Sequence, residues 1–440
     1  MVISAVEPAP SQVRRALLFA IIVVVVGVMA TTLAQTQLLG LIPIRNLLKN
    51  TMHASREHTA AFVFWATIPW YFKPLVGVVQ DAFPLFGTRR KSYMLVASVL
   101  TSVAWLVLGI TPYEYRAFLI VCIGINAATV LVSTAVGGYM VEIARASASS
   151  GRLTSVRNIV EQASFIVSGV GSGYLASLHF GWTAITCGSV AFLLVPVALW
   201  CLKESPVAAE TGAQVLKAAG SKLAQVGRAK ALWMAACVSF LFYFAPGIQT
   251  AQFYAQQNDL HLTTLQQGTL VSLGGIFGVL SAFLYGAFAA KRFTLRSLLL
   301  ACIVIGASTQ AAYAIYYSYG VAKIVDSYYG FGYTLAEVAM MHLAVRATPA
   351  GCEAMGFALM MAVRNFGLFG GDWLGAALQD HFHLTFHTLA LINGAGSLLA
   401  LPIVLLLPAR IVLGRDAQPV DPVQDMAVDT TAVTAHGSPG

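Results

Sequence analysis

The sequence predicts an all-α integral membrane protein whose twelve transmembrane helices form two parallel six-helix repeats. Hydrophobic residues make up 58% of the 440 residues and charged residues only 10%, which is too apolar for a soluble chain of this length. Twelve apolar runs are each long enough, at about 20 residues, to cross a hydrocarbon core of roughly 30 Å. One polar segment separates the sixth run from the seventh, as expected for two repeats.

These runs divide the chain into two halves and three polar segments. Residues 16–203 hold the first six predicted spans, residues 231–410 hold the last six, and residues 204–230 form a cytoplasmic linker loop between them. Residues 1–15 form an N-terminal tail, and residues 411–440 are expected to be a disordered tail because they are poor in apolar residues. The predicted spans are 16–43, 59–79, 92–111, 115–141, 155–178, 181–203, 231–255, 267–289, 295–317, 320–345, 355–378 and 385–410.

The positive charges favour one side of the predicted membrane. Most of the 26 Lys and Arg residues fall on the side of the two tails and the linker, and the positive-inside rule places that side in the cytoplasm. The opposite side holds Arg45, Lys49, Arg56 and Arg116. We therefore expect an inner or plasma membrane protein with both termini in the cytoplasm. Its net charge of +8 reflects this topology and contact with anionic lipid, not binding of nucleic acid.

Residues 69–93, PWYFKPLVGVVQDAFPLFGTRRKSY, place charges in an otherwise apolar helix and end in a basic turn. Lys73, Gly77 and Asp81 recur every four residues, so they share one helix face. The turn that follows contains Arg89 and Arg90, and such a basic loop normally stays in the cytoplasm. This segment is therefore predicted to be the second span and the loop after it.

The same segment resembles the cytoplasmic gating loop of major facilitator transporters and, more closely, the folate-biopterin transporter family. The positions that match that family in order are Pro69, Trp70, Lys73, Pro74, Gly77, Asp81, Pro84, Gly87, Arg89 and Arg90. A second matching block covers residues 348–378, with Pro349, Gly351, Glu353, Phe357, Ala358, Leu359, Asn365, Gly371 and Gly375. The resemblance implies the major facilitator fold and transport of folate-like or pterin-like anions, although the helices between the two blocks show little similarity.

The resemblance also implies a gate on the cytoplasmic side. Asp81, Arg89, Arg90 and Glu142 are expected to form an ion-pair cluster that holds the two halves together in the outward-open state, since opposite charges bind well in a half-dry interface. The alternative is a plain topogenic loop with solvated charges. The gating candidates are Lys73, Gly77, Asp81, Arg89, Arg90 and Glu142.

Ionisable residues at membrane depth are costly, so they persist mainly where they pair or face water. Counted from the cytoplasmic ends of their spans, Glu337 and Arg364 lie at matching depth. We hypothesise that substrate anion competes for Arg364 and that the released carboxylate takes up a proton, which gives symport. The alternative is a permanent structural ion pair. Glu161 is expected to be the corresponding buried acid of the first half.

Uncharged polar residues are predicted to line the same passage. Gln249, Gln252 and Gln256 share one face of the seventh span, and amides facing lipid would be costly, so they are expected to line a central cavity together with Gln35. A pterin offers amide-like edges and a flat ring that suit such residues. The predicted substrate and proton pathway comprises Gln35, Glu161, Gln249, Gln252, Asp326, Tyr333, Glu337, Arg364 and Asp372.

Spaced glycines predict close helix packing. They occur as Gly367, Gly371 and Gly375 in the eleventh span, Gly274 and Gly278 in the eighth, and Gly169 and Gly173 in the fifth.

The favoured function is secondary active transport of a folate-like or pterin-like anion by alternating access, coupled to protons. A permease for a muropeptide, a nucleoside or an organic acid is the first alternative, because a gating motif reports mechanism and not cargo. A membrane sensor or enzyme is the second, but no cluster of catalytic residues is visible in the spans. The chain has no GxxxxGK[ST] motif for ATP, and its six cysteines show no metal spacing. We expect a monomer that needs no cofactor or metal ion and whose partners are its substrate, protons and lipid.

Overall fold

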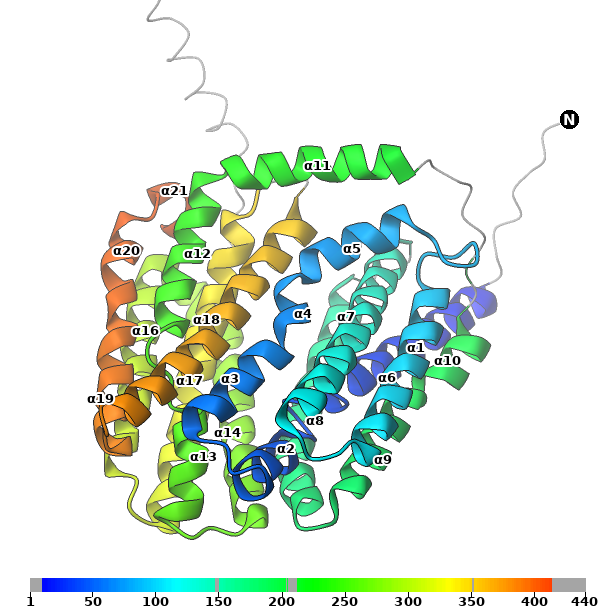
Figure 1. Ribbon diagram of the computed structural model, residues 1–440. Coiled ribbons are helices and arrows are strands. Elements are labelled where there is room, and N and C mark those ends of the chain that lie inside the picture. Colours follow the sequence, from blue (N-terminus) through cyan, green and yellow to red (C-terminus); the bar gives the residue numbers. More distant parts are fainter. Residues whose placement is uncertain (1–9, 147–149, 203, 205–211, 350–351, 414–440) are drawn as a thin grey trace, which may run out of the picture.

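The computed structural model of the protein describes residues 10–146, 150–202, 204, 212–349 and 352–413. Apart from an isolated β-bridge between Leu85 and Thr88, the regular elements of these residues are helices. Most of them run up and down in a single bundle (Figure 1). The predicted tail at residues 411–440 lies outside the described residues from residue 414 onward, as does most of the predicted tail at residues 1–15.

The N-half, residues 10–202, crosses the bundle six times in the described part of the chain. The passes are α1, the broken helix α3–α5, then α6, α7, α8, and α9 with α10. The bounds are α1 (Pro10–Leu33), α2 (Leu41–Asn46), η1 (Leu47–Thr51), α3 (Arg56–Ala66), α4 (Ile68–Tyr71), α5 (Lys73–Ala82), α6 (Lys91–Ile110), α7 (Tyr115–Ala146), α8 (Ser150–Ala176), α9 (Phe180–Phe192) and α10 (Leu194–Cys201).

The C-half, residues 230–413, also makes six passes within the described residues. They are α12 with α13, α14 with its short extensions, α16, α17, α18, and α19 with α20. The bounds are α12 (Lys230–Tyr243), α13 (Gln249–Asn258), α14 (Thr264–Leu284), η2 (Tyr285–Ala289), α15 (Ala290–Arg292), α16 (Leu295–Ala311), η3 (Ala312–Ile315), α17 (Tyr319–Ala347), α18 (Glu353–His381), α19 (Phe386–Ser397), η4 (Leu398–Ala400), α20 (Leu401–Leu406) and α21 (Ala409–Val412).

Between the halves lies α11 (Gly212–Arg228), which crosses one end of the bundle at the top of Figure 1. We call this end the linker end and the opposite end, which carries α2 and the C-terminus of α13, the far end. The linker was expected to be a loop, and that expectation was wrong for residues 212–228. The segment is rich in Ala, Lys and Gln, which are good helix formers, and Val226 is buried against the C-half.

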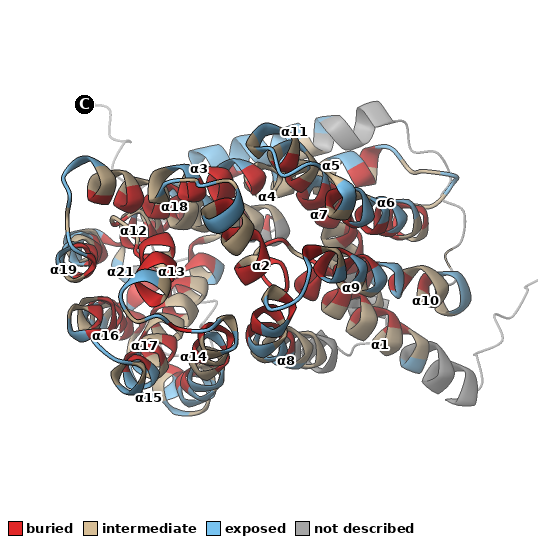
Figure 2. Ribbon diagram, turned by 60° about the horizontal axis from the view of Figure 1, so that its bottom comes forward, coloured by how far each residue is buried: buried red, intermediate tan, exposed pale blue. Residues whose placement is uncertain are grey.

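Prolines and one early helix end change the predicted spans. The first span was expected to run to residue 43, but α1 ends at Leu33 and the chain then turns into the short, largely buried α2, which lies near the centre of Figure 2. Proline lacks an N–H donor and interrupts the helical ladder, so the second pass breaks before Pro69 and Pro74. The seventh pass breaks around Pro246.

Six passes are long and apolar enough to span a membrane by length and composition alone, counting only described residues. They are Lys91–Ile110, Tyr115–Met140, Phe180–Cys201, Thr264–Arg292, Leu295–Ile315 and Phe386–Leu406. Several of the other passes carry charges along their length, such as Lys73 in α5, Glu161 in α8 and Arg364 in α18. Charges of this kind belong on helices whose faces meet other helices or water rather than lipid.

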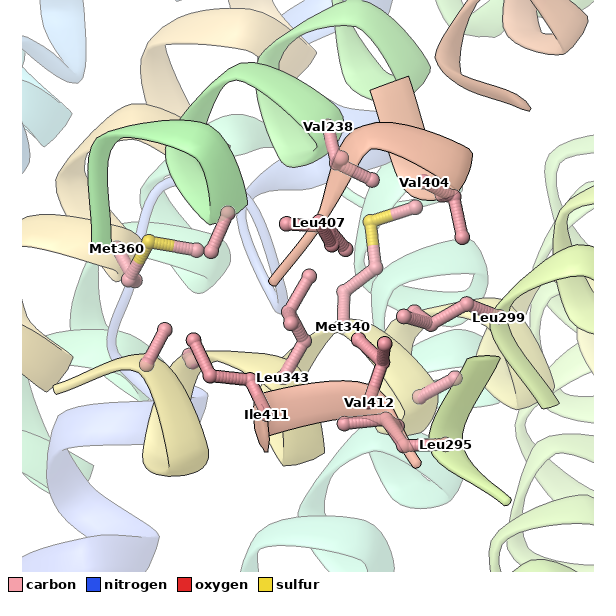
Figure 3. Close-up of a cluster of buried hydrophobic side chains, with 14 of the residues drawn as sticks. Val238, Leu295, Leu299, Met340, Leu343, Met360, Val404, Leu407, Ile411 and Val412 are labelled. Carbon is pink, nitrogen blue, oxygen red and sulfur yellow. The ribbon is translucent and has the colours of Figure 1, made fainter. Parts of the chain in front are cut away.

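The larger apolar clusters each lie within one half. In the C-half, side chains from α12, α16, α17, α18, α20 and α21 pack together toward the linker end (Figure 3). Fully buried Leu299, Leu343 and Val404 are part of this cluster. Two separate clusters fill the N-half, one of them around Trp105 and Phe118. Each half therefore has its own core, and the contact between halves depends on other residues.

Glycines allow helices to touch through their backbones, as the spacing predicted. In the seam between α8 and α14, a Cβ on Gly173 would lie 2.5 Å from the Thr264 carbonyl oxygen. Between α14 and α17, a Cβ on Gly330 would lie 2.1 Å from the Gly274 carbonyl oxygen. On α18, a Cβ on Gly375 would lie 2.0 Å from the carbonyl oxygen of Gly247, which belongs to the break in the seventh pass.

We expect Gly330→Ala to destabilise the protein by about 2 kcal/mol, the usual cost of overpacking a tight contact. The added methyl group would collide with backbone atoms of Gly274, which cannot rotate away. The melting temperature of the detergent-solubilised protein measures the effect. Gly286→Ala is the matched control, because a methyl group there meets nothing within 4 Å. Equal melting temperatures for the two variants would contradict the prediction.

Candidate functional site

Glu337 and Arg364 form an ion pair near the middle of α17 and α18, through Oε1 of the glutamate and Nη2 of the arginine. The predicted contact is therefore present, while its role stays a prediction. The side chain of Glu337 is 28% exposed and that of Arg364 is 16% exposed, so the pair is neither fully solvated nor fully buried. The guanidinium carbon of Arg364 also lies 5.3 Å from the centre of the Tyr243 ring, a favourable cation–π distance.

Aromatic side chains surround this pair. Tyr243 of α12 and Tyr333 of α17 meet edge to face with ring centroids 5.9 Å apart, and Tyr329 stacks on Tyr333 at 5.0 Å. Within the described residues the buried Tyr333 hydroxyl has no hydrogen-bond partner, which is costly unless water or a ligand supplies one. Flat rings and a free hydroxyl beside an arginine can hold a flat, polar, anionic molecule.

A second aromatic group joins the two halves beside Arg364. The ring of Phe366 on α18 lies 5.6 Å from Tyr71 and 5.6 Å from Phe64 of the N-half. Trp373, about two turns farther along α18, lies 5.3 Å from Phe64. This group fixes α3 and α4 against α18 at the depth of the ion pair.

Lys73 lies apart from the rest of the predicted gating set. Its Nζ donates to Ser133 Oγ of α7 at 3.0 Å and lies 5.0 Å from the Trp70 ring centroid. Glu161 and Arg157 of α8 are within electrostatic range of Lys73 and pair with each other at 3.8 Å. Glu161 was expected to be buried, but its side chain is 37% exposed.

Three of the predicted gate residues meet at the linker end. Arg90 Nη2 donates to Asp81 at 2.7 Å and its Nε donates to Glu142 at 2.8 Å. Burial opposes the charge of Arg90, but the two carboxylates outweigh it and raise the pKa of the guanidinium above its ordinary value. A Cβ on Gly138 would lie 2.5 Å from Arg90 Cζ, so a larger residue there would force the guanidinium group to shift.

The expected function of this cluster as a bridge between halves is not what this conformation shows. Asp81, Arg90 and Glu142 all belong to the N-half, so their ion pairs tie α5, α6 and α7 of one half together. Arg89 contributes its backbone N–H, which donates to Glu204 at 2.8 Å. A Cβ on Gly77 would lie 3.6 Å from Thr134 Cγ2 of α7, which is an ordinary contact distance. Any bridging role would need another conformation.

Sequence reasoning missed Glu204, which it placed in the linker. Its carboxylate accepts hydrogen bonds from the backbone N–H groups of Arg89, Arg90 and Lys91. An acid at a helix N-terminus satisfies unpaired backbone donors and the helix dipole. No local pattern signals this contact, because it joins residues more than a hundred positions apart.

At the far end, Arg45 was expected to be a loop cation, and that expectation was wrong. Arg45 is 6% exposed in α2; its Nη2 lies 4.0 Å from Asp372 Oδ2 of α18, and its Nη1 donates to the Gln249 carbonyl oxygen at 3.4 Å. Asp372 is itself buried and accepts hydrogen bonds from Thr250 N and Oγ1. The assigned pathway residue Asp372 is thus part of a contact between the halves.

Most polar contacts between described residues of the two halves gather at this far end. Lys49 Nζ donates to Gln257 at 2.8 Å, and Thr59 Oγ1 lies 2.9 Å from the Tyr254 hydroxyl. Arg56 and Asp380 pair at 3.0 Å on the wall of a cavity of about 680 Å³ that opens at this end. Together with the Arg45 contact, these interactions hold the far end closed.

The glutamines on α13 were expected to line a central cavity, but two of them bind inside the C-half instead. Gln252 donates to Asp326 of α17 at 2.8 Å, and Gln256 donates to the Tyr316 hydroxyl at 2.8 Å. Asp326 also accepts from the hydroxyls of Tyr313 and Tyr316. This buried carboxylate is satisfied by neutral donors, so Asp326 and Gln252 form a network separate from the Glu337 pair.

The remaining two predicted amides, Gln35 and Gln249, make other contacts. Gln35 donates to the carbonyl oxygen of Thr31, one turn earlier. The backbone of Gln249 accepts the bond from Arg45 described above.

Comparison with known proteins accords with this geometry. A family model described as the BT1 family matches residues 36–424. A folate-biopterin transporter of Synechocystis sp. is 26% identical over 427 residues, covering 89% of this chain and 84% of that protein. The solved nucleoside transporter NupG has a TM-score of 0.68 at 14% identity, covering 89% of this chain and 98% of its own. The inward-open xylose transporter XylE from E. coli has a TM-score of 0.64 at 16% identity, covering 94% and 99%.

The two solved structures show a shared fold and, at this identity, nothing about cargo. The expected major facilitator fold is therefore confirmed. The family model spans most of the chain, including both sequence blocks that resemble folate-biopterin transporters. The chain belongs to the BT1 family, and it is accordingly a multi-pass membrane protein of a transporter family rather than an enzyme.

Proposed function

We propose that this protein is a secondary carrier that moves a folate-like or pterin-like organic anion by alternating access, coupled to protons. The observation that carries the proposal is the Glu337–Arg364 pair, a partly exposed ion pair at membrane depth with tyrosine rings on one side. A purely structural pair would be expected to be sealed from water or replaced by apolar packing, because burying charges is costly. An ion pair that must open to bind a substrate anion has to remain accessible from the passage.

The chemistry of this site suits the proposed cargo. Arg364 can bind a carboxylate through two parallel hydrogen bonds, and Tyr243 and Tyr333 offer rings for stacking and hydroxyls for hydrogen bonding. Once substrate occupies the arginine, Glu337 loses its counter-charge in a poorly solvated place, which favours its protonation. Binding of anion and proton are thereby linked at one pair of side chains.

Topology and assembly are further parts of the proposal. The basic turn at Arg89 and Arg90 and the basic linker segment share the linker end, which supports a cytoplasmic linker end and cytoplasmic termini. The closed far end then faces outward, so the conformation described here is closed to the outside. Within each half the helices pack on their own core, and a monomer suffices for the passage between halves.

Counterflow tests the proposed function. Purified protein in liposomes preloaded with unlabelled folate or biopterin should accumulate the corresponding labelled solute transiently, without any imposed gradient. An inward-directed proton gradient should then drive net uptake. Nucleosides, organic acids and muropeptides in the same assay test the alternative cargoes, and counterflow with one of these but with neither pteridine would reject the proposal.

A further inference from the structure

We infer that Lys73 is the anion-binding residue of the N-half and that it makes the carrier prefer pteridines with a dicarboxylate tail over pteridines that lack one. The inference rests on the proposed function, because it concerns the same passage. Lys73 was grouped with the gating residues, but the structure places it away from the Asp81–Arg90–Glu142 cluster, against Ser133 and Trp70.

The charge of Lys73 is not neutralised by any carboxylate within 4.0 Å among the described residues. Its hydrogen-bond partner is the neutral hydroxyl of Ser133, and its other contact is the face of Trp70. Glu161 lies within electrostatic range of Lys73 but forms its ion pair with Arg157 at 3.8 Å. A lysine at membrane depth without a carboxylate in direct contact is costly, so an anion supplied by a substrate would be bound favourably.

Lys73 and Arg364 lie at the same depth on opposite sides of the contact between halves. Tyr71, two residues before Lys73, packs its ring on Phe366, two residues after Arg364, with centroids 5.6 Å apart. From this shared point the two side chains diverge. Lys73 reaches α7 of the N-half, whereas Arg364 reaches Glu337 on α17 of the C-half.

This arrangement provides two cations, one from each half, for a single bound molecule. Arg364 is available only when its bond to Glu337 opens, whereas Lys73 has no carboxylate to release. A pteridine with a dicarboxylate tail, such as folate, can satisfy both cations. A pteridine without that tail, such as biopterin, can stack on Tyr243 and Tyr333 but leaves Lys73 without a counter-ion.

The test compares counterflow of labelled folate and labelled biopterin by wild type, Lys73→Gln and Lys73→Arg in liposomes. We expect Lys73→Gln to raise KM for folate at least tenfold and to leave KM for biopterin within twofold. Lys73→Arg keeps the charge and should retain most of the preference. Lys323→Gln is the control, because this exposed lysine rests on the Tyr319 ring at the far end.

The outcomes separate the inference from the function on which it rests. Suppose that wild type carries both solutes. If Lys73→Gln then changes the two KM values by the same factor, or changes neither KM value, the inference fails and the proposed function stands. If wild type carries neither solute, the proposed function fails and the inference fails with it. A Lys73→Gln protein that carries biopterin normally also shows that the variant is folded.

Discussion

Glu337→Gln should retain counterflow of labelled folate but lose accumulation driven by a proton gradient. In the proposed cycle the carboxylate of Glu337 both competes with substrate for Arg364 and takes up the proton. Glutamine keeps the size of the side chain but carries no charge and no titratable proton. The apparent KM for the anion should therefore fall, by about tenfold if the lost competition is worth about 1.4 kcal/mol.

Arg364→Gln should show the opposite pattern. Removing the arginine leaves Glu337 without its partner and substrate without its main cation. We expect counterflow and gradient-driven uptake to fall together, by at least about a hundredfold in kcat/KM. Glu57→Gln is the control, because this acid lies at the far end beside His381.

A permanent structural pair would give different results. In that case Glu337→Gln and Arg364→Gln would both lower the melting temperature and lower transport alike, and the double variant would recover part of the loss. Proton-driven accumulation that persists in a folded Glu337→Gln protein would remove Glu337 from the coupling mechanism.

The pairing of Glu337 with Arg364 could be predicted from sequence because depth along a helix follows from counting residues. With a rise of 1.5 Å per residue, two charges at equal distance from the same membrane face on consecutive passes lie close enough to pair. Their contact is therefore present as predicted. Spaced glycines were predictable for a similar reason, since small residues one turn apart leave a groove for a neighbouring helix.

The partners of the glutamines on α13 could not be predicted in the same way. Their spacing correctly indicates one polar face, but a face can meet any neighbouring helix, and here Gln252 meets Asp326 within its own half. Arg45 was missed because α1 ends ten residues earlier than the apolar run suggests. The cation then lies in a buried helix of six residues, too short for periodicity to reveal.

For the gate cluster, the motif predicted the contacts among its residues but not their arrangement between the two halves. The residue types and their mutual contacts follow the resemblance, since Arg90 pairs with Asp81 and Glu142. A motif records which residues act together across a whole transport cycle, whereas one structure holds one state of that cycle. With the far end closed by contacts between halves, the linker-end cluster has no need to bridge them.

Replacing Arg45 by glutamine should open the far end. Arg45 of α2 reaches Asp372 of α18 and the backbone of Gln249, both in the C-half, and it is almost completely buried. Truncating one partner of a buried charge pair costs about 2 kcal/mol or more. This cost destabilises only the far-end-closed state, in which Arg45 contacts the C-half. The equilibrium should therefore shift by about thirtyfold toward the far-end-open state. Spin labels at Thr51 and His261, both exposed at the far end on different halves, would report the longer distance in a cysteine-free background.

Arg56→Gln is the matched control for the Arg45 variant. Arg56 also joins the halves, through Asp380 at 3.0 Å, but its side chain is 35% exposed, and such surface pairs are worth only about 0–1 kcal/mol. The distance distribution of Arg56→Gln should therefore stay close to that of wild type. If both variants lengthened the distance equally, closure would depend on the sum of far-end charges. If Arg45→Gln left the distribution unchanged, the aromatic contact between Phe64, Tyr71 and Phe366 would be sufficient to hold the halves together.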